Sequence, residues 1–520
     1  MKTKNKIMMR SPKLKLLLPL TLLINTLGCF AQSPINSEPS NPPQPTTVAL
    51  PSNPSPTTVA IAKKAKGAKA AKPAYAFVDS ICLNTHWSYG DTPYGSNYDG
   101  VRQKLVALGV RHIRDGGASG DVIRKMQQLA RQGIKTTYIM NPNVGVAPNS
   151  SYWVTDPGYN VVDFVKKVGT NVIDAVEISN EIDLNFQKYY WRKGDKEKIN
   201  DDPNSSNYWV PYIRSLTKDT YRALKSDRAT ARVKVIGPSL GRTYTYDSKS
   251  PLGDLSTVVD WGNFHPYPSG GNPFNNPFPY NTIEKYYWHS NFPSVNIDKN
   301  PYAFDVYAPP FGGKPMAATE TGYFTTKGRN GISEKVHGKY IPRLFLEYFR
   351  NGVPRTCAYE LVDEWNKPDN SEANYGLVRH NLSPKPAYTA LKNMISVLKD
   401  PQGARIFPRS VNYNLSFKAP PKYDRTEYIH DLLLQKRDGS FYLVLWHEIS
   451  NGDRSVTPVR EINPPPIPTQ VNLVTPMRSA TIYTLNDAGN MSTKAIPIRN
   501  NRINLNVTDK ATIIKLIPRR

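Results

Sequence analysis

The sequence has few cysteines, with only three among 520 residues. Cys29 lies in an N-terminal segment with the features of an export signal, which leaves Cys82 and Cys357 for the rest of the chain. Two cysteines allow at most one bridge. A fold held by several disulfides and a metal site built on cysteine thiolates are therefore excluded.

Long hydrophobic runs are also missing. The longest is residues 16–27, which is too short to span a bilayer as a permanent helix. Six lysines or arginines precede this run, so residues 1–31 are expected to be a signal peptide. Two processing alternatives stay open: cleavage after Ala31, or lipid attachment at Cys29 of "TLGC". The expected location is outside the cytoplasm (secreted, periplasmic or surface-attached), with membrane contact only through a lipid on Cys29.

A dense basic block is absent although the net charge is +25. Eleven lysines or arginines lie in residues 1–72 against the single acid Glu38, and the remaining excess is spread over the rest of the chain. No nucleic-acid motif accompanies this charge, so no nucleic-acid partner is expected. The interpretations left are a solvated basic surface and attraction to an anionic glycan.

Residues 32–73 are rich in Pro, Ser, Thr, Ala and Lys and contain "PTTVA" twice. Such a composition cannot bury enough apolar surface to fold, so it predicts a disordered linker.

Between residues 74 and 400, short apolar runs alternate with segments of helical periodicity. The predicted strands are "SICLNTH", "VRHIRD", "KTTYIMN", "AVEISNE", "VKVIGPS", "WGNFHPY", "PMAATETG" and "TCAYELVDE". Eight such strands with helices between them predict a (β/α)8 TIM barrel, and a doubly wound open sheet is the alternative. After residue 400 the pattern changes to strands without helices, starting with a hairpin around Asp438-Gly439. Residues 401–520 are therefore expected to form an all-β sandwich.

The active site of a (β/α)8 barrel lies at the carboxyl ends of its strands. The polar residues at those ends are His86, Arg114, Asp115, Asn141, Asn180, Glu181, Ser239, His265, Tyr267, Glu320, Glu364 and Trp365. Two carboxylates stand out because Glu181 ends the fourth strand and Glu320 ends the seventh. Such a pair suits cleavage of a glycosidic bond, where one group is protonated and the other ionised. Strand alternation places Glu177 in the barrel interior instead.

The motifs "EISNE" at 177–181, "HPY" at 265–267 and "TETGY" at 319–323, with Trp365, resemble the large clan of retaining glycosidases with (β/α)8 barrels. The C-terminal sandwich is similar to the appended domain of the β-xylosidase and iduronidase branch. In that clan a glutamate after strand four is the acid/base and a glutamate on strand seven is the nucleophile. The resemblance implies an exported retaining glycoside hydrolase that cleaves a polysaccharide or oligosaccharide without a metal or cofactor.

Carried onto this chain, the resemblance implies Glu181 as acid/base and Glu320 as nucleophile. It implies the following substrate-binding or orienting residues: Asn180 at the sugar 2-hydroxyl, Tyr267 and Arg114 on Glu320, His86 and His265 on the sugar or the carboxylates, and Trp365 under the ring. The chain departs from the clan at Ile182, where a proline is common, and in the unmatched residues Tyr323 and 268–313. These departures concern the subfamily and the substrate.

Two alternatives compete with this interpretation. "GPSLG" at 237–241 matches the nucleophile elbow of serine hydrolases, although a loop follows it where a helix is expected. A non-catalytic carbohydrate-binding or wall-associated protein could also keep the barrel. Cys82 and Cys357 fall on the first and eighth strands, which are neighbours in a closed barrel. Bridges between adjacent parallel strands are rare, so two buried thiols are expected.

Overall fold

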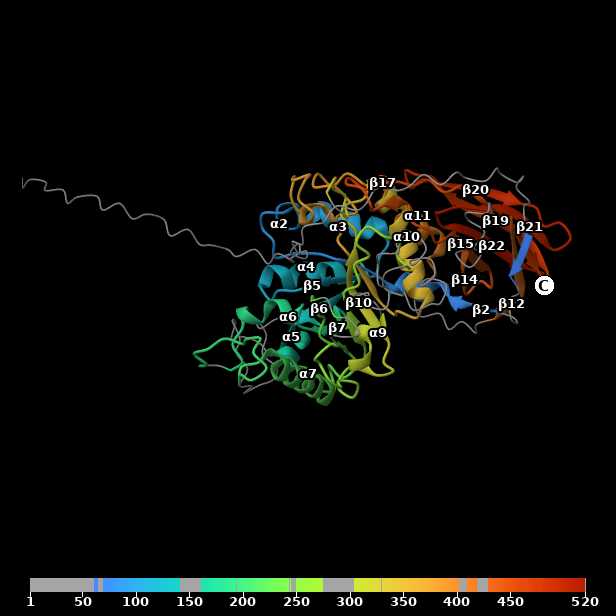
Figure 1. Cartoon of the computed structure of the whole chain (residues 1–520). Coiled ribbons are helices and arrows are strands. Elements are labelled where there is room, and N and C mark those ends of the chain that lie inside the picture. Colours follow the sequence, from blue (N-terminus) through green and yellow to red (C-terminus); the bar gives the residue numbers. More distant parts are fainter. Residues whose placement is uncertain are drawn as a thin grey trace, which may run out of the picture. The chain divides into compact units, whose positions relative to one another are not determined.

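Eight parallel strands alternate with helices through the middle of the chain in the computed structural model (Figure 1). The structure describes residues 60–63, 69–140, 160–192, 194–242, 244, 249–274, 304–328, 330–401, 409–418 and 429–519. The predicted signal peptide, the strand-end residue Asn141 and residues 32–59 of the predicted linker lie outside this part of the chain.

The eight strands form one parallel sheet in the order β8-β7-β6-β5-β4-β11-β10-β9. They are β4 (Ile81–Asn84), β5 (His112–Asp115), β6 (Lys135–Met140), β7 (Ile173–Ile178), β8 (Lys234–Ile236), β9 (Gly262–Phe264), β10 (Met316–Gly322) and β11 (Thr356–Tyr359). A parallel bridge between Ile236 and Trp261 joins the two ends of the sheet, and Gly237 N donates to Trp261 O at 2.9 Å. The sheet is therefore closed, which confirms the predicted barrel and excludes the open doubly wound sheet.

The helices between the strands are α1 (Ala74–Ser80), α2 (Pro93–Ser96), α3 (Tyr98–Leu108), α4 (Gly120–Ala130), α5 (Val161–Val168), α6 (Ile182–Asn185), α7 (Trp209–Ser226), α9 (Phe304–Tyr307), α10 (Glu334–Arg350) and α11 (Pro386–Leu398). Side-chain caps start several of them: Ser119 accepts from Val122 N before α4, and Ser333 accepts from Val336 N before α10. Among these helices, none is long and apolar enough to cross a membrane.

The C-terminal region is a β-sandwich, as predicted. Its strands are β12 (Ser410–Val411), β13 (Tyr413–Lys418), β14 (Ile429–Gln435), β15 (Phe441–His447), β16 (Gly452–Asp453), β17 (Arg460–Glu461), β18 (Ile467–Leu473), β19 (Met477–Leu485), β20 (Met491–Ile496), β21 (Arg502–Val507) and β22 (Thr512–Pro518). One core contains side chains from both main sheets, such as Leu415 of β13 and Leu443 of β15. The Asp438-Gly439 turn joins β14 and β15, with Gly439 at φ 84°, a conformation that glycine adopts without steric cost.

Part of the predicted linker is ordered, which corrects the expected boundary. β1 (Ala60–Lys63) pairs with β13, β2 (Lys69–Ala70) pairs with β12, and β3 (Lys72–Pro73) pairs with β14. The prediction of disorder over 60–63 and 69–73 is therefore wrong. Backbone pairing with strands far along the chain stabilises these short segments, and their own composition gives no sign of it.

The sandwich also contacts the barrel helices. Leu432, Val444 and Trp446 belong to the same buried cluster as the barrel core. Arg343 of α10 donates to Oε1 of Glu448 at 2.7 Å and to Oε2 at 3.0 Å, and all of these groups are buried. The sandwich therefore packs on the outside of the barrel through both apolar and ionic contacts.

Cys82 of β4 and Cys357 of β11 form a disulfide, so the expectation of two free thiols is wrong. The two residues are direct partners in the register of the parallel pair, and their Cα atoms are 4.1 Å apart. The sequence identified the neighbouring strands correctly. It did not give the register that places these two side chains opposite each other.

Candidate active site

Glu181 and Glu320 come from different strands and meet at the carboxyl ends of the barrel strands. Glu320 lies within β10, and Glu181 follows the end of β7. One carboxylate oxygen of each and one ring nitrogen of His265 all lie within 4.8 Å of one another. Both glutamates are buried, with 7% of Glu181 and 2% of Glu320 exposed. The two strand-end carboxylates singled out in the sequence therefore lie in one site.

Three donors surround the Glu320 carboxylate. Nη1 of Arg114 lies 2.6 Å from Oε1, the hydroxyl of Tyr267 donates to Oε2 at 2.9 Å, and Nδ1 of His265 lies 3.5 Å from Oε2. Burial alone would raise the pKa of Glu320, but the positive charges of His265 and Arg114 hold this pKa below its ordinary value. Glu320 is therefore held as a carboxylate anion.

Buried residues inside the barrel hold the Arg114 side chain in place. Its Nε and Nη2 pair with the two oxygens of Glu177 at 2.5 and 2.8 Å, and Nη1 also donates to Asn84 Oδ1 at 2.9 Å. Burial would raise the pKa of Glu177, but the charge of Arg114 lowers it to about 2. Glu177 thus lies in an interior polar network, as expected. Arg114 contacts Glu320, as the resemblance implies.

Asn180 lies beside this network. Its Oδ1 accepts from Nη2 of Arg114 at 2.7 Å. No described residue accepts a hydrogen bond from its Nδ2, and the side chain is half-buried at the mouth. Asn180 is therefore oriented by Arg114 and keeps an amide donor for a ligand.

Glu181 is held from several sides. Its backbone adopts φ 44°, a conformation that is uncommon for residues other than glycine, and its N–H donates to Ser239 Oγ at 3.2 Å. Its Oε1 lies 2.9 Å from Nδ1 of His265. Gly241 contacts the other side of the carboxylate so closely that a Cβ atom there would lie 2.8 Å from Cδ of Glu181. The position of the Glu181 carboxylate is thus fixed by His265 and Gly241.

Asp183 holds the loop that carries Gly241. Its two oxygens accept from the N–H groups of Gly241 and Arg242 at 2.8 and 2.9 Å, and from the hydroxyl of Tyr244 at 3.1 Å. Burial raises the pKa of Asp183 to about 6, with a further contribution from the charge of Glu181. Asp183 is a positioning residue that the sequence did not reveal, because it lies beyond the strand end in a short helical turn.

His265 carries a positive charge between the two glutamates. Burial would lower its pKa, but Glu320, Glu177 and Glu181 raise this pKa to about 9. Its Nε2 lies 3.0 Å from Thr319 Oγ1, which fixes the ring. The predicted contact of His265 with the carboxylates is therefore present, and the proton that it carries lies next to Glu181.

His86 contacts a different pair of carboxylates. Its Nδ1 lies 2.5 Å from Glu364 Oε1 and 3.4 Å from Glu360 Oε2, at the end of β11. Burial would lower the pKa of His86, but the charge of Glu364 and a hydrogen bond to Glu360 raise it well above its ordinary value. Burial and the Glu364 charge raise the pKa of Glu360 to about 8. Glu360 was not predicted, because the expected strand "TCAYELVDE" runs on to Glu364, four residues further along, whereas β11 ends at Tyr359.

Tyr359 packs among the aromatic rings around Tyr267, which is the tyrosine that contacts Glu320. The Tyr359 ring lies 6.5 Å from Tyr267, 5.1 Å from Tyr375 and 5.5 Å from His86 between ring centroids. Trp365 is half-exposed, and its Nε1 donates to Asp91 at 3.0 Å. The role of Trp365 as a platform under the sugar ring stays a prediction.

Ser239 does not have the surroundings of a nucleophile. It is fully buried, its Oγ donates to Glu177 at 3.3 Å, and it accepts from the Glu181 backbone. The described residues that follow it form a loop. Ser239 therefore belongs to the network below the glutamates, and the serine-hydrolase alternative is wrong.

Two groups at the mouth have donors that a metal ion could use, His86 with Glu360 and Glu364, and His265 with Glu181 and Glu320. In both groups the pKa of the histidine is raised by the neighbouring carboxylates, and burial alone would lower it. A protonated imidazole nitrogen has no lone pair for a metal. The donor sets therefore suit hydrogen bonding better than metal coordination.

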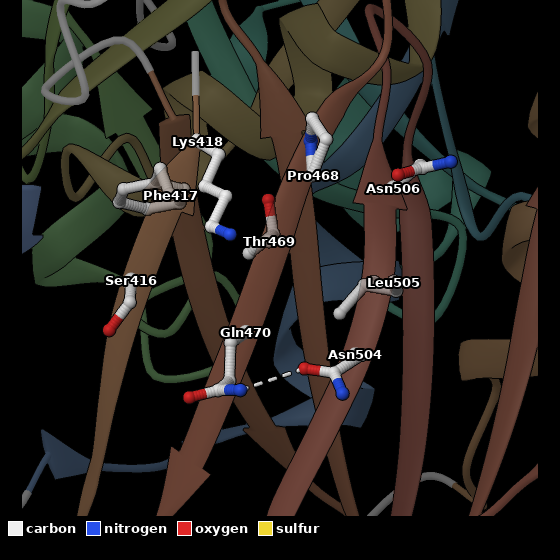
Figure 2. A pocket seen from close by; sticks show the side chains of 9 residues that line it. All are labelled: Ser416, Phe417, Lys418, Pro468, Thr469, Gln470, Asn504, Leu505 and Asn506. Atoms are coloured by element: carbon white, nitrogen blue, oxygen red, sulfur yellow. Dashed lines mark hydrogen bonds between the residues drawn. The ribbon is translucent and has the colours of Figure 1, made fainter. Parts of the chain in front are cut away.

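A hollow of about 680 Å³ lies on the four-stranded sheet of the sandwich (Figure 2). Gln470 Nε2 donates to Asn504 Oδ1 at 2.9 Å across it, and Lys418 is the charged residue in its lining. No carboxylate lines this hollow, so it cannot supply the acid and the nucleophile that hydrolysis of a glycoside needs.

No family model matches the chain, and no curated protein sequence matches it. Similar solved structures include a family 39 glycoside hydrolase from the gut symbiont Bacteroides cellulosilyticus WH2, with 15% identity, a TM-score of 0.48, and coverage of 86% of this chain and 81% of that one. The catalytic domain of GH30 xylanase C from Talaromyces cellulolyticus has 11% identity and a TM-score of 0.48, covering 86% and 99%. CelM2, a bifunctional glucanase-xylanase from a metagenome library, has 12% identity and a TM-score of 0.48, covering 87% and 97%. Similarity at this level does not assign an activity to this chain.

Proposed function

We propose that this chain is an exported retaining glycoside hydrolase that cleaves O-glycosidic bonds of a polysaccharide or oligosaccharide. The observation that carries the proposal is the approach of Glu181 and Glu320, which have carboxylate oxygens within 4.8 Å of each other. Retaining enzymes have their two carboxyl groups about 5 to 5.5 Å apart, whereas inverting enzymes leave about 6.5 to 9.5 Å for a water molecule. The short separation favours double displacement.

In the first step, an oxygen of Glu320 attacks the anomeric carbon and the bond to the leaving oxygen breaks. Arg114 and Tyr267 keep Glu320 ionised and aimed, through contacts of 2.6 and 2.9 Å. The leaving oxygen takes a proton from Glu181. This proton is held between His265 and Glu181, whose Nδ1 and Oε1 atoms are 2.9 Å apart.

In the second step, a water molecule attacks the anomeric carbon, Glu181 accepts its proton, and the bond to Glu320 breaks. Asn180 keeps its Nδ2 donor for the sugar, next to the carboxylate that forms the covalent intermediate. The chain's own residues provide the nucleophile, the acid and the base.

Export is supported by the basic head and the apolar run at residues 16–27. Lipid attachment at Cys29 and cleavage after Ala31 are both compatible with these residues. The alternative of a non-catalytic carbohydrate-binding protein is disfavoured, because binding alone does not require an ionised and a proton-carrying group side by side.

The test is covalent trapping. A panel of 2-deoxy-2-fluoro glycosides and cyclitol epoxides should label Glu320, identified by peptide mass spectrometry, and Glu320→Gln should abolish the label. The Asp99→Asn variant, on the exposed face of α3, is a matched control that should label normally. Intact glycan binding with no label across the panel would favour the binding-protein alternative, and label on another residue would overturn the assignment of Glu320.

A further inference from the structure

The outward face of the four-stranded sheet β1-β13-β18-β21 is a part of the molecule that the proposed hydrolysis does not use. Side chains alternate between the two faces of a strand, and Leu415, Val471 and Ile503 point into the core of the sandwich. Nine side chains of β13, β18 and β21 alternate with such core residues and point to the opposite face. They are Asn414, Ser416, Lys418, Pro468, Gln470, Asn472, Arg502, Asn504 and Asn506.

Several of these side chains lie side by side on neighbouring strands. Ser416 of β13, Gln470 of β18 and Asn504 of β21 are cross-strand partners in one row of the sheet. Gln470 Nε2 donates to Asn504 Oδ1 at 2.9 Å, and Asn472 Nδ2 donates to Ser416 Oγ at 3.1 Å. Figure 2 shows this row at the hollow of about 680 Å³, with Lys418 beside it. Contacts between strands thus hold the polar groups in place around the hollow.

Amide side chains are unusually frequent on this face. Five of its nine side chains are amides, namely Asn414, Gln470, Asn472, Asn504 and Asn506. Asparagine is depleted in β-strands, and Asn504 and Asn506 are exposed, so burial does not compensate for this. An amide offers donors and an acceptor together, as a sugar hydroxyl does. Amides on strands about 4.8 Å apart can therefore hydrogen-bond successive hydroxyls of a glycan that lies across the sheet.

Lys418 and Arg502 give this face a positive charge. Both are exposed, and neither forms an ion pair with the described residues. Arg502 is the cross-strand partner of Asn472, in the row next to Gln470. β13, β18 and β21 contain no aspartate or glutamate that could offset these cations. The face therefore attracts an anion, and these strands have no carboxylate to repel one.

An aromatic platform is missing among the nine outward side chains of β13, β18 and β21. Phe417 borders the hollow, but it is 1% exposed and belongs to the core. Pro468 is the apolar side chain on the face. Binding sites for neutral small molecules rely mainly on apolar and aromatic contacts, with a few polar groups for orientation. Affinity at this face has to come from charge and hydrogen bonds instead.

We infer that this face is a non-catalytic binding surface for an acidic polysaccharide. The anionic groups of the polymer pair with Lys418 and Arg502, and its hydroxyls pair with amides such as Gln470 and Asn504. A neutral glycan would leave both cations without a partner. A symmetric dimer formed through this face would bring the same cations of two copies together. The inference goes beyond the proposed hydrolase, because this surface can hold a polymer whether or not the barrel cleaves it.

The test measures binding of the full chain to immobilised polygalacturonate by biolayer interferometry, with xylan as the neutral polymer and a DNA duplex as a second polyanion. All proteins carry Glu320→Gln, so that the polymer is not degraded. Lys418→Glu should weaken polygalacturonate binding about fivefold or more, because an attractive charge becomes a repulsive one. The double variant Gln470→Ala with Asn504→Ala should also weaken it, and this loss should persist at high salt, where charge contacts are screened.

Lys218→Glu is the matched control. It makes the same change of charge at an exposed position of α7, and it should leave the affinity for polygalacturonate within about twofold. Xylan binding should not differ between the variants and their parent. The altered side chains of Lys418, Gln470 and Asn504 lie outside the core, so all variants should unfold at the same urea concentration as the parent.

No binding of polygalacturonate, or binding that Lys418→Glu and the double variant leave intact, would overturn the inference. An equal loss in Lys218→Glu would also overturn it, since the attraction would then come from the whole basic surface. Tighter binding of the DNA duplex, lost in the same variants, would assign the face to nucleic acid. Self-association that Lys418→Glu abolishes in size-exclusion chromatography would assign it to a second copy of the chain. Covalent labelling of Glu320 tests the hydrolase separately, because it does not involve this sheet.

Discussion

Nδ1 of His265 lies 2.9 Å from Oε1 of Glu181. The same nitrogen lies 3.5 Å from Oε2 of Glu320, so one ring atom is in reach of both carboxylates. A positive His265 between them reduces the repulsion of two negative groups at short range. It also places a proton next to the residue that has to deliver one. This single contact therefore connects the stability of the site with its chemistry.

The charge of His265 predicts a pH-dependent stability. Burial would lower its pKa, but Glu320, Glu177 and Glu181 raise this pKa from an ordinary 6.5 to about 9. Because the pKa is raised on folding, protonated His265 stabilises the fold in full below about pH 6.5, and this contribution is lost as the pH rises through about 9. The difference corresponds to on the order of 3 kcal/mol. The loss in free energy of unfolding caused by His265→Gln, measured by urea denaturation, should therefore shrink from pH 6 to pH 10. A loss that does not change with pH would contradict this.

Arg114 should be among the most sensitive positions in the barrel. It is buried and pairs with both Glu177 and Glu320. Arg114→Met leaves two buried carboxylates without their cation, so the free energy of unfolding should fall by about 3 to 5 kcal/mol at pH 7. Arg102→Met is the control, since Arg102 pairs with the exposed Asp99 on α3 and should cost less than about 1 kcal/mol. Similar losses for the two variants in urea denaturation would show that the Arg114 network does not hold the site together.

Counting thiols distinguishes a protein with the Cys82–Cys357 disulfide from one in which both cysteines are free. In a Cys29→Ser variant, the denatured protein should have no thiol that reacts with a thiol reagent before reduction. After reduction it should have two. Cys82→Ser with Cys357→Ser should lower the free energy of unfolding by about 2 to 4 kcal/mol, because the bridge closes a long loop. Two reactive thiols before reduction would mean that the bridge is not formed.

The fold followed from local sequence patterns to a large extent. Buried parallel strands such as "TTYIM" and "AVEI" consist mostly of apolar and β-branched residues, and their alternation with helices such as α4 and α10 is enough to predict the barrel. Strand ends then placed Glu181 and Glu320 correctly, because parallel strands all end on one side of a barrel. Neither step needs information about contacts between distant residues.

What the sequence did not reveal depends on such contacts. Lys72 pairs with Leu434 across more than half of the chain, so the ordered end of the linker cannot be seen in its composition. Asp183 lies in a short turn beyond a strand, and it joins the site only through the loop of Gly241 and Arg242 that it holds. Tyr359 lies in an apolar strand pattern that is equally typical of the core. The carboxylate pair and its contacts with Arg114, Tyr267 and His265 were thus predicted from the sequence, whereas Asp183 and the close approach of Gly241 were not.

Replacing Gly241 with a larger residue should lower the activity and leave the fold intact. A Cβ atom at this position would lie 2.8 Å from Cδ of Glu181 and 2.4 Å from Cδ1 of Leu184. Gly241→Ala should therefore push the Glu181 carboxyl away from the leaving oxygen. Because a displacement of about 1 Å can cost about a hundredfold in rate, kcat should fall by about that factor on the substrate identified by screening.

The control for this variant is Gly120→Ala at the start of α4, where an added Cβ meets no atom within 4 Å. It should leave kcat unchanged and stabilise the helix slightly, since alanine is the better helix former. Asp183→Asn should resemble Gly241→Ala, because it loosens the loop that presses Gly241 against Glu181. Substrates with an activated leaving group need little help from an acid, so both variants should recover much of their rate on aryl glycosides with a good leaving group. If Gly241→Ala slows activated and unactivated substrates equally, Gly241 does not act through the acid/base residue.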